Sequence, residues 1–252
     1  MRPASNPPVL PPAASQFSLH LHDEYVDAHA FAGFALPADL MKAVPKRQLY
    51  FRAGRCCARE ALRRLDPGRP VGIVARDASG CPVWPTGTVG SITHTEGFVS
   101  AAAALARDAA SVGIDAERIM SAARAREVAT HVAWPSELAI AVDAGLDRLE
   151  AMTLAFSAKE AFFKCAYPLL RKTIGFHAVR LMEVDSGSGG FTLRIAEALP
   201  GLFALGAVVQ GRFSLDAPWM HTGMLLPPSE ASGEAVSATE SEVLHATRAT
   251  GR

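Results

Sequence analysis

The sequence predicts an α+β fold built from two similar α/β halves that meet near residue 110. The order of its elements carries this prediction: a strand and a helix come first, then several strands, then helices, then strands again. The size of the chain agrees with it. Its 252 residues, 49% of them hydrophobic, suffice for a core in one domain or in two closely packed halves.

The N-terminal half is expected over residues 16–110, after a flexible, proline-rich leader over residues 1–15. "FSLHLHD" (17–23) alternates as a strand does, and "VGIVA" (71–75) is a short apolar strand. Between them, "PKRQLYFRAGRCCAREALRRL" predicts a helix, with Pro45 in its first turn and "DPG" after its end. "VGSITHT", "FVSAAAALA" and "SVGIDAE" predict three strands joined by short turns, as in an antiparallel meander.

The C-terminal half is expected over residues 111–226. "SAARAREVATHVAWPSELAIAVDAG" predicts helix with a break at Pro135. "LDRLEAMTLAFSAKEAFFKCAYPLL" predicts the longest helix, which is apolar on much of its surface and therefore central. Further strands are expected in "FTLRI" and in the apolar stretches of residues 203–226. Residues 227–252 are small and polar, and they predict a disordered tail.

The composition excludes several classes of protein. Lys plus Arg and Asp plus Glu balance at 25 each, and general nucleic-acid binding needs an excess of positive charge. No uninterrupted run of 18 apolar residues predicts a membrane span, and the leader lacks the apolar core of a signal peptide. The four cysteines form no CxxC pair and predict free thiols in a reducing compartment. We therefore expect a cytoplasmic protein.

Two carboxylates end the strand "VGIDAE". Asp115 and Glu117 are two residues apart, so they point to the same face of a strand. Like charges placed so close repel, unless a cation lies between them or one is protonated. Mg²⁺ suits such a pair, because it takes a few carboxylate oxygens and fills its octahedron with water and phosphate oxygens. From the spacing alone, however, a plain strand end leading into a solvated turn is the favoured interpretation.

The stretch "FSAKEAFFK" places charges among aromatic residues on the longest helix. Glu160 and Lys164 are four apart and share a face, while Lys159 lies one step around the helix. An ordinary salt bridge on a half-exposed helix explains this pattern. The alternative is functional: a third carboxylate, and two cations for a phosphate group.

Basic residues follow the first long helix, and a histidine ends a strand. Arg47 and Arg55 are eight apart and project in similar directions, although Arg52 competes with them. For most of these arginines a solvated face is the better interpretation. His94 ends the strand in "VGSITHTEG", where it could donate to an anion, but the pattern does not distinguish it from an ordinary loop histidine.

Taken in order, "FRAGRCCAREAL", "PVWPTGTVGSITHTEG", "VGIDAE" and "LAFSAKEAFFK" resemble the 4′-phosphopantetheinyl transferases, more closely the enterobactin-synthase-type branch that serves peptide and polyketide synthases. The resemblance covers roughly residues 45–185. It implies a pseudo-twofold fold, each half a small, mostly antiparallel sheet with a long helix, and coenzyme A bound between the halves. It also implies the reaction, which moves the 4′-phosphopantetheine arm of coenzyme A to a serine of an apo acyl or peptidyl carrier protein and leaves 3′,5′-ADP. Such carriers belong to polyketide, nonribosomal peptide or fatty-acid synthases.

The resemblance also implies roles for single residues. The expected ligands of Mg²⁺, or of Mn²⁺ in its place, are Asp115, Glu117 and Glu160. The expected cofactor-binding residues are Arg47, Arg55, Arg76, Thr93, His94, Asp115, Lys159 and Lys164, with Thr93 and His94 at the 3′-phosphate and Lys164 at a bridging phosphate. The expected catalytic residues are Lys164, with Glu160 as general base and Glu117 as the alternative base.

One departure from the family pattern concerns the loop before "PVWP". The related branch often carries a lysine just before the glycine of this loop, where this chain has Ser79. Either Arg76 compensates or the phosphate is held less firmly.

Two other functions remain open at this point. A magnesium-dependent nucleotide phosphohydrolase would use the same three acids, and a non-catalytic protein that binds coenzyme A or a carrier would not turn the cofactor over. Because the two halves build the cleft within one chain, a monomer is the expected state.

Overall fold

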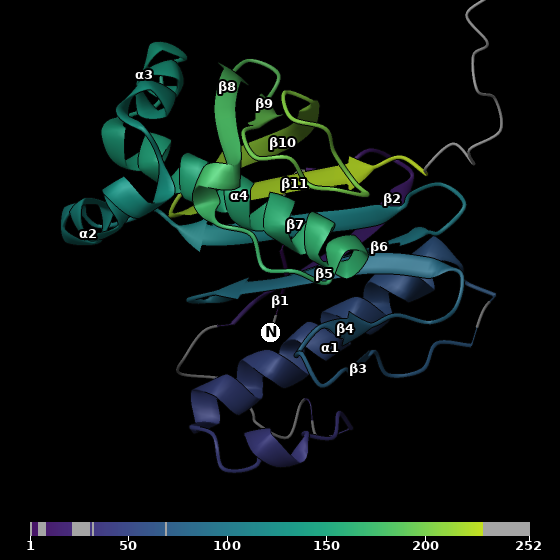
Figure 1. Ribbon diagram of the computed structural model, residues 1–252. Coiled ribbons are helices and arrows are strands. Elements are labelled where there is room, and N and C mark those ends of the chain that lie inside the picture. Colours follow the sequence, from purple (N-terminus) through teal and green to yellow (C-terminus); the bar gives the residue numbers. More distant parts are fainter. Residues whose placement is uncertain (1, 5–8, 22–30, 32, 69, 229–252) are drawn as a thin grey trace, which may run out of the picture.

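The computed structural model describes residues 2–4, 9–21, 31, 33–68 and 70–228 of the chain. It has the expected α+β architecture, with two main antiparallel sheets and a long helix packed on each (Figure 1). The pseudo-twofold relation between the halves and the boundary near residue 110 stay predictions. Apart from its first two residues, the predicted tail lies outside the described residues.

The N-terminal sheet has the strand order β1 (Arg2–Pro3), β2 (Ala14–His20), β6 (Phe98–Leu105), β5 (Thr88–Thr95). Helix α1 (Pro45–Leu65) packs against β2, β5 and β6, and the short helix η2 (Ala38–Leu40) precedes it. Strands β3 (Ala75–Arg76) and β4 (Pro82–Val83) form a separate ribbon. Of the strand predicted over residues 71–75, the last residue belongs to β3 and the rest is irregular.

Strand β6 is the centre of the N-terminal half. Ala101 and Ala103 pack with α1 on one face, whereas Ala102 and Ala104 pack on the other face with Val9 and Leu10. Small side chains let both layers approach the strand closely. Val9 and Leu10 are 3% and 5% exposed, and β2 already begins at residue 14. Within the predicted leader over residues 1–15, Val9 and Leu10 therefore cover an alanine face that would otherwise meet water.

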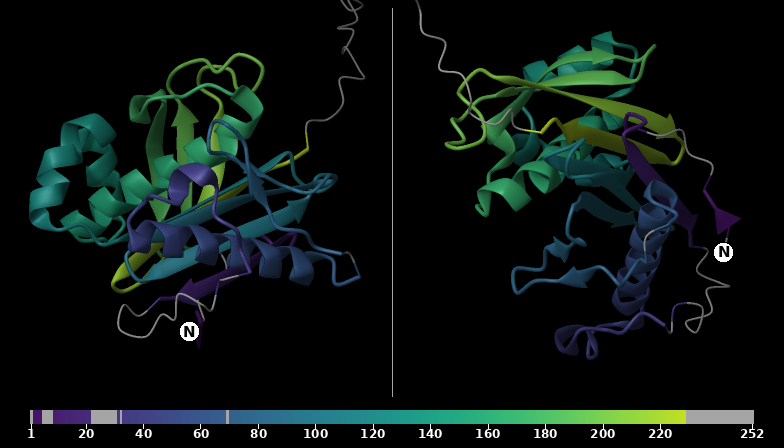
Figure 2. Two further views of the ribbon diagram at one scale, coloured as in Figure 1. Left: turned by 90° about the horizontal axis from the view of Figure 1, so that it is seen from below. Right: turned by 90° about the vertical axis from the view of Figure 1, so that its right-hand side faces the viewer.

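The C-terminal sheet has the strand order β7 (Ser111–Arg118), β11 (Trp219–Leu226), β10 (Val208–Asp216), β9 (Gly190–Ile195), β8 (Val179–Asp185). The predicted central helix, α4 (Arg148–Leu170), crosses β7 and β11 and contributes most of the apolar side chains under this sheet. Helices α2 (Ala122–Val132) and α3 (Pro135–Asp143) pack beside α4, with the expected break before Pro135, and η3 (Phe176–Ala178) follows (Figure 2).

The predicted meander of three strands is wrong at its third member. Strand β6 pairs with β2 on one edge and β5 on the other, so no edge remains for β7, which pairs with β11 instead. Strand β7 nevertheless lies beside β5, and the two sheets meet there (Figure 1). Side-chain hydroxyls of β5 accept hydrogen bonds from backbone amides of β7, and we call this row the seam: Ser91 from Ile114 at 3.2 Å, Thr93 from Ala116 at 3.2 Å, Thr95 from Arg118 at 3.4 Å.

The two long helices begin and end at residues suited to those positions. Pro45 opens α1, where its missing N–H costs nothing, and the Asp147 side chain accepts from the first amides of α4. Helix α4 ends at Arg171, which has a left-handed backbone with φ of 52°. Within the described ranges, no helix has both the length and the apolar character needed to cross a membrane.

The packing of His221 near the seam predicts an acid-sensitive stability. Its ring is 3% exposed and lies 4.6 Å from that of Phe98, centroid to centroid. Burial lowers the pKa of His221 to about 4, although the charge of Asp216 opposes this shift. The unfolded chain takes up this proton near pH 6.5, so stability is complete above that pH and is lost as the pH falls toward 4, by roughly 3 kcal/mol in all.

We expect His221→Phe to lose less stability than the wild type between pH 7 and pH 4.5. Urea unfolding at a series of pH values measures this difference. The variant retains every other titrating group, so the difference between the two slopes isolates His221. Equal slopes would show that this ring is not held neutral by burial.

Candidate functional site

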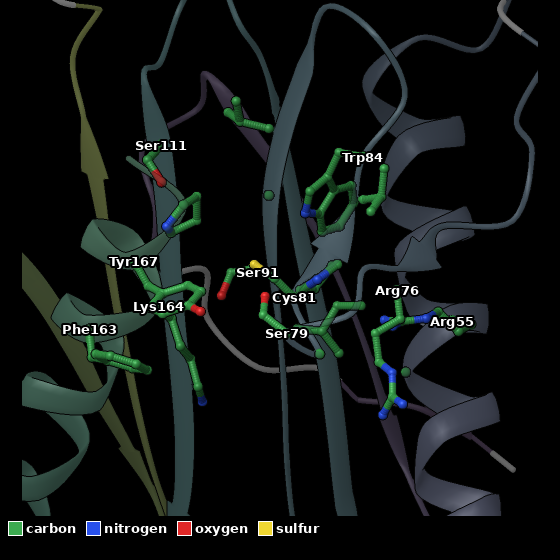
Figure 3. Close-up of a pocket in the computed structure, with 18 of the residues that line it drawn as sticks. Arg55, Arg76, Ser79, Cys81, Trp84, Ser91, Ser111, Phe163, Lys164 and Tyr167 are labelled. Atoms are coloured by element: carbon green, nitrogen blue, oxygen red, sulfur yellow. The ribbon is translucent and has the colours of Figure 1, made fainter. Parts of the chain in front are cut away.

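A cleft of about 760 Å³ lies between the two halves. Its walls come from α1, β5 and the β3–β4 loop on one side, and from the start of β7 and the last turns of α4 on the other (Figure 3). No Asp or Glu is among the described residues that line it. Its basic lining residues come from both halves: Arg47, Arg55, Arg76, His94, Lys164 and Arg171. The cleft therefore suits a ligand with several negative charges.

Arg55 is the most buried of these cations. It is 5% exposed, its guanidinium lies 4.6 Å from the ring centroid of Phe51, and its Nε has no hydrogen-bond partner among the described residues. Burial, with help from the charge of Arg76, lowers the pKa of Arg55 to about 10. A buried, incompletely paired cation is costly, and a bound anion would relieve that cost. Arg52 instead donates to the Phe34 carbonyl and, unlike Arg47 and Arg55, does not line the cleft.

The β3–β4 loop is organised by Asp77. Its Oδ1 accepts from the amides of Ser79 and Cys81 and from the Ser79 hydroxyl, while its Oδ2 accepts from Arg171 at 2.7 Å. The Arg171 bond joins the end of α4 to the opposite wall of the cleft. Ser79 therefore shapes the turn, whereas Arg76, the last residue of β3, lines the cleft and pairs with Asp39 at 2.5 Å (Figure 3).

Trp84 forms part of the apolar wall, and Gly90 makes room for it. A Cβ at Gly90 would lie 2.6 Å from the Trp84 ring and 2.3 Å from the Ala102 carbonyl oxygen. Trp84 in "PVWP" thus packs its indole against β5 at Gly90 in "VGS", where the strand has no side chain.

Asp115 lies beside the cleft and is 3% exposed. Its Oδ1 accepts from the Thr93 hydroxyl at 3.0 Å and from the Lys164 ammonium at 2.5 Å, and its Oδ2 accepts from the Ser157 hydroxyl at 2.8 Å. Lys164 also lines the cleft, so this side chain connects the basic cleft with the acidic residues behind it.

Glu117 and Glu160 share the electrostatic environment of Asp115. Burial, the charge of Asp115 and that of Glu160 raise the pKa of Glu117 to about 8, against the opposing charge of Lys164. Burial also raises the pKa of Glu160, with Asp115 adding to the shift and Lys164 opposing it. Burial and mutual repulsion thus disfavour negative charge on Glu117 and Glu160, and a bound cation would favour it.

The three acids form an all-oxygen donor set, which fits the chemistry of a hard divalent cation. As the side chains stand, however, no three Asp, Glu, His or Cys residues in the described part of the chain form a group that could hold a metal ion. Lys164 is bonded to Asp115 in that arrangement. The common metal centre of Asp115, Glu117 and Glu160 stays a prediction.

His94 is exposed to the cleft, and its ring lies 5.2 Å from that of Tyr50. The protein atoms around it partly desolvate the ring and lower the pKa of His94, and the charge of Lys164 acts in the same direction. His131 and His177 do not line the cleft, since His131 lies at the end of α2 and His177 stacks on Trp134.

Comparisons with known proteins agree with this arrangement. A family model described as the 4′-phosphopantetheinyl transferase N-terminal domain matches residues 36–104, and that of the 4′-phosphopantetheinyl transferase superfamily matches residues 111–205. The 4′-phosphopantetheinyl transferase Svp of Streptomyces mobaraensis is 42% identical over 182 residues, which cover 69% of this chain and 67% of Svp. The chain belongs to the 4′-phosphopantetheinyl transferase superfamily. It is an enzyme of that class, and coenzyme A is its substrate.

Two further relatives show how far the similarity extends. The 4′-phosphopantetheinyl transferase Npt of Nocardia iowensis is 34% identical over 196 residues, covering 73% of this chain and 81% of Npt. Enterobactin synthase component D of Escherichia coli (strain K12) is 39% identical over 132 residues, covering 51% of this chain and 59% of that protein.

The predicted role of Lys159 of this transferase in cofactor binding stays a prediction, and the structure places its side chain away from the cleft. Its side chain is 1% exposed, and its ammonium lies 2.8 Å from Glu137 Oε1 and 2.8 Å from the Val132 carbonyl oxygen. Burial lowers the pKa of Lys159, against the effect of Glu137. Residues 159 and 160 are neighbours in sequence but about 100° apart around the helix, so Lys159 faces α2 and α3 when Glu160 faces the acids.

The predicted contact of Thr93 with a phosphate of the cofactor stays a prediction, and the structure gives its side chain other partners. Thr93 is 3% exposed and does not line the cleft. Its hydroxyl accepts from the Ala116 amide at 3.2 Å and from Lys164 at 3.2 Å, and it donates to Asp115 at 3.0 Å. A hydroxyl has one proton and two lone pairs, so these three bonds use its full hydrogen-bonding capacity in this arrangement.

The sequence patterns did not identify Arg171 or Ser157, which also contact residues of the candidate site. Arg171 follows the end of α4, and only the folded β3–β4 loop reveals its partner Asp77. Ser157 stands in the "FSAKEAFFK" stretch, but its contact with Asp115 joins residues 42 apart in sequence. The sequence feature that could have indicated Ser157 is a serine beside charged residues in a helix predicted to be central.

Proposed function

We propose that this transferase binds coenzyme A in the cleft between the halves and moves the 4′-phosphopantetheine arm to a serine of an apo acyl or peptidyl carrier protein. The observation that carries the proposal is Lys164, which lines the basic cleft and also bonds to the buried acid Asp115. A polyanion held by Arg47, Arg55, Arg76 and His94 would place its pyrophosphate within reach of both. Since both walls of the cleft come from one chain, we propose that a monomer is active.

Asp115, Glu117 and Glu160 are the residues that would hold Mg²⁺ or Mn²⁺, which supplies neutralising charge for the pyrophosphate when bound. Lys164 contributes a cation of its own and stabilises the charge that develops on the leaving phosphate oxygen. The carrier serine oxygen attacks the phosphorus that bears the pantetheine, and the bond to the bridging oxygen breaks, which releases 3′,5′-ADP. Glu160 accepts the serine proton, with Glu117 as the alternative.

Intact-mass measurement tests this function. The purified protein is incubated with coenzyme A, Mg²⁺ and a panel of apo acyl and peptidyl carriers, beside a carrier whose acceptor serine is alanine. We expect the gain of one phosphopantetheine arm on at least one carrier and none on the serine-free control. Release of free phosphopantetheine or phosphate with every carrier unmodified would favour the phosphohydrolase. Binding without any product would favour the non-catalytic protein.

Substitution of His94 tests the binding of the cofactor. We expect His94→Ala to raise the KM for coenzyme A about tenfold and to change kcat little, because a cleft-lining donor contributes to binding before and during the reaction alike. Steady-state transfer with varied coenzyme A and saturating carrier measures both constants. His131→Ala, which alters an exposed histidine outside the cleft, is the matched control. An unchanged KM in His94→Ala would remove His94 from the cofactor site.

A further inference from the structure

We infer that Thr93 and Ser157 are positioning residues that hold the carboxylate of Asp115 in one orientation, and that Thr93 makes this orientation depend on the contact between the two halves. The inference deepens the proposed function and rests on its metal site. It assigns to Thr93 a different role from the binding of phosphate.

The direction of each hydrogen bond at Thr93 is fixed by its neighbours. The Ala116 amide and the Lys164 ammonium can only donate, so they occupy the two lone pairs of the hydroxyl oxygen. The single hydroxyl proton is then directed to Oδ1 of Asp115, at 3.0 Å. Thr93 thus binds the carboxylate, its neighbouring backbone and its cation at the same time.

Ser157 holds the other oxygen of the same carboxylate. It is 0% exposed on α4, and its hydroxyl donates to Oδ2 at 2.8 Å. Thr222 on β11 is also 0% exposed, and its hydroxyl oxygen lies 2.9 Å from that of Ser157. With one hydroxyl on each oxygen, the carboxylate cannot rotate without breaking a buried hydrogen bond.

Thr93 is the member of this set that belongs to the N-terminal half. It is the middle hydroxyl of the seam, whereas Asp115, Ser157 and Thr222 all lie in the C-terminal half. The orientation of Asp115 is therefore complete only when β5 lies against β7. The contact between β5 and β7 also joins the two walls of the cleft, so Asp115 is oriented where these walls meet.

Hydrogen-bond partners of metal ligands typically change metal affinity or activity by about 10- to 100-fold when they are removed. We therefore expect Thr93→Val and Ser157→Ala to weaken Mn²⁺ binding at least about tenfold. Mn²⁺ is titrated into the full-length protein, with and without coenzyme A, and free Mn²⁺ is followed by electron paramagnetic resonance. Carrier modification and thermal unfolding are measured on the same samples.

Two further variants separate positioning from stability. Thr93→Ser keeps the hydroxyl and is expected to bind Mn²⁺ close to the wild-type affinity. Thr95→Val removes the next hydroxyl of the seam, which accepts from the Arg118 amide, whereas the Asp115 carboxylate is held by Thr93, Ser157 and Lys164. It is expected to lower the unfolding temperature while leaving Mn²⁺ affinity unchanged.

The outcomes distinguish the inference from the proposal on which it rests. Wild-type Mn²⁺ affinity in folded Thr93→Val and Ser157→Ala would overturn the inference alone, as would an equal loss of affinity in Thr95→Val. If Thr93→Val does not fold, Ser157→Ala and Thr93→Ser decide between these results. A wild-type protein that binds no Mn²⁺ and modifies carriers in the presence of EDTA would overturn the metal site itself, and the inference with it.

Discussion

Asp115→Ala is expected to abolish transfer, with kcat/KM reduced by at least about 10³-fold, and Glu160→Gln is expected to do the same. The first substitution removes the carboxylate that Thr93, Ser157 and Lys164 hold in place. The second keeps the shape of the side chain but removes both its charge and its capacity to accept the serine proton. Intact-mass analysis of a carrier after incubation with coenzyme A and Mg²⁺ measures the loss.

The fold is expected to survive both changes. In Asp115→Ala the Lys164 ammonium, on a side chain that is 27% exposed, can turn toward water in the cleft. The seam bond from the Ala116 amide to Thr93 is also retained. Asp108→Ala, in the exposed turn before β7, is the matched control and should transfer at the wild-type rate. Near-wild-type carrier modification by either folded variant would contradict the catalytic role of that acid.

Losing the base alone should cost less than losing the metal site. General-base catalysis typically contributes about 10²- to 10⁴-fold, whereas the acids also neutralise charge on the pyrophosphate. Glu117 and Glu160 are the candidate bases, and burial raises the pKa of each in the metal-free protein. Asp115, held on both oxygens by hydroxyls, is better suited to fixed coordination.

The sequence predicted the helices better than the pairing of the strands. The periodicity from Pro45 to Leu65 and the long apolar segment around Phe162 each correspond to one helix, because local patterns determine these elements. The partner of β7 depends instead on β11, whose pairing with it joins Asp115 to Thr222 across 107 residues. No local pattern indicates that β6 already has a neighbour on each edge.

The candidate site shows the same division. His94, Arg47, Arg55 and Lys164, which were expected to bind the cofactor, all line the cleft. Lys159 was expected at the cofactor because it lies beside Lys164 in the matched stretch, and Thr93 because the family resemblance pairs it with His94. A step of one residue turns a side chain to another face of a helix or strand, which is why Lys159 meets Glu137 and Thr93 meets Asp115.

Gly113→Ala is expected to destabilise the protein by about 3 kcal/mol, which lowers Tm by roughly 10 °C in a chain of this size. A Cβ at Gly113 would lie 2.0 Å from the Ala161 carbonyl oxygen and 2.9 Å from the Cys165 amide nitrogen. Both atoms belong to the backbone of α4, so no side-chain rotation relieves the overlap. The φ of Gly113 lies outside the left-handed region, and the whole cost therefore comes from pushing the helix off β7.

The displacement should also reduce transfer, because α4 carries Ser157, Glu160 and Lys164 while β7 carries Asp115 two residues after Gly113. Thermal unfolding and carrier modification of the same sample measure both effects. Gly72→Ala, where an added Cβ would meet nothing within 4 Å, should match the wild type in both. A wild-type Tm in Gly113→Ala would mean that α4 does not approach β7 this closely. The contacts between Asp115 and the side chains of α4 would then lose their structural basis, since the same approach of helix to strand brings them together.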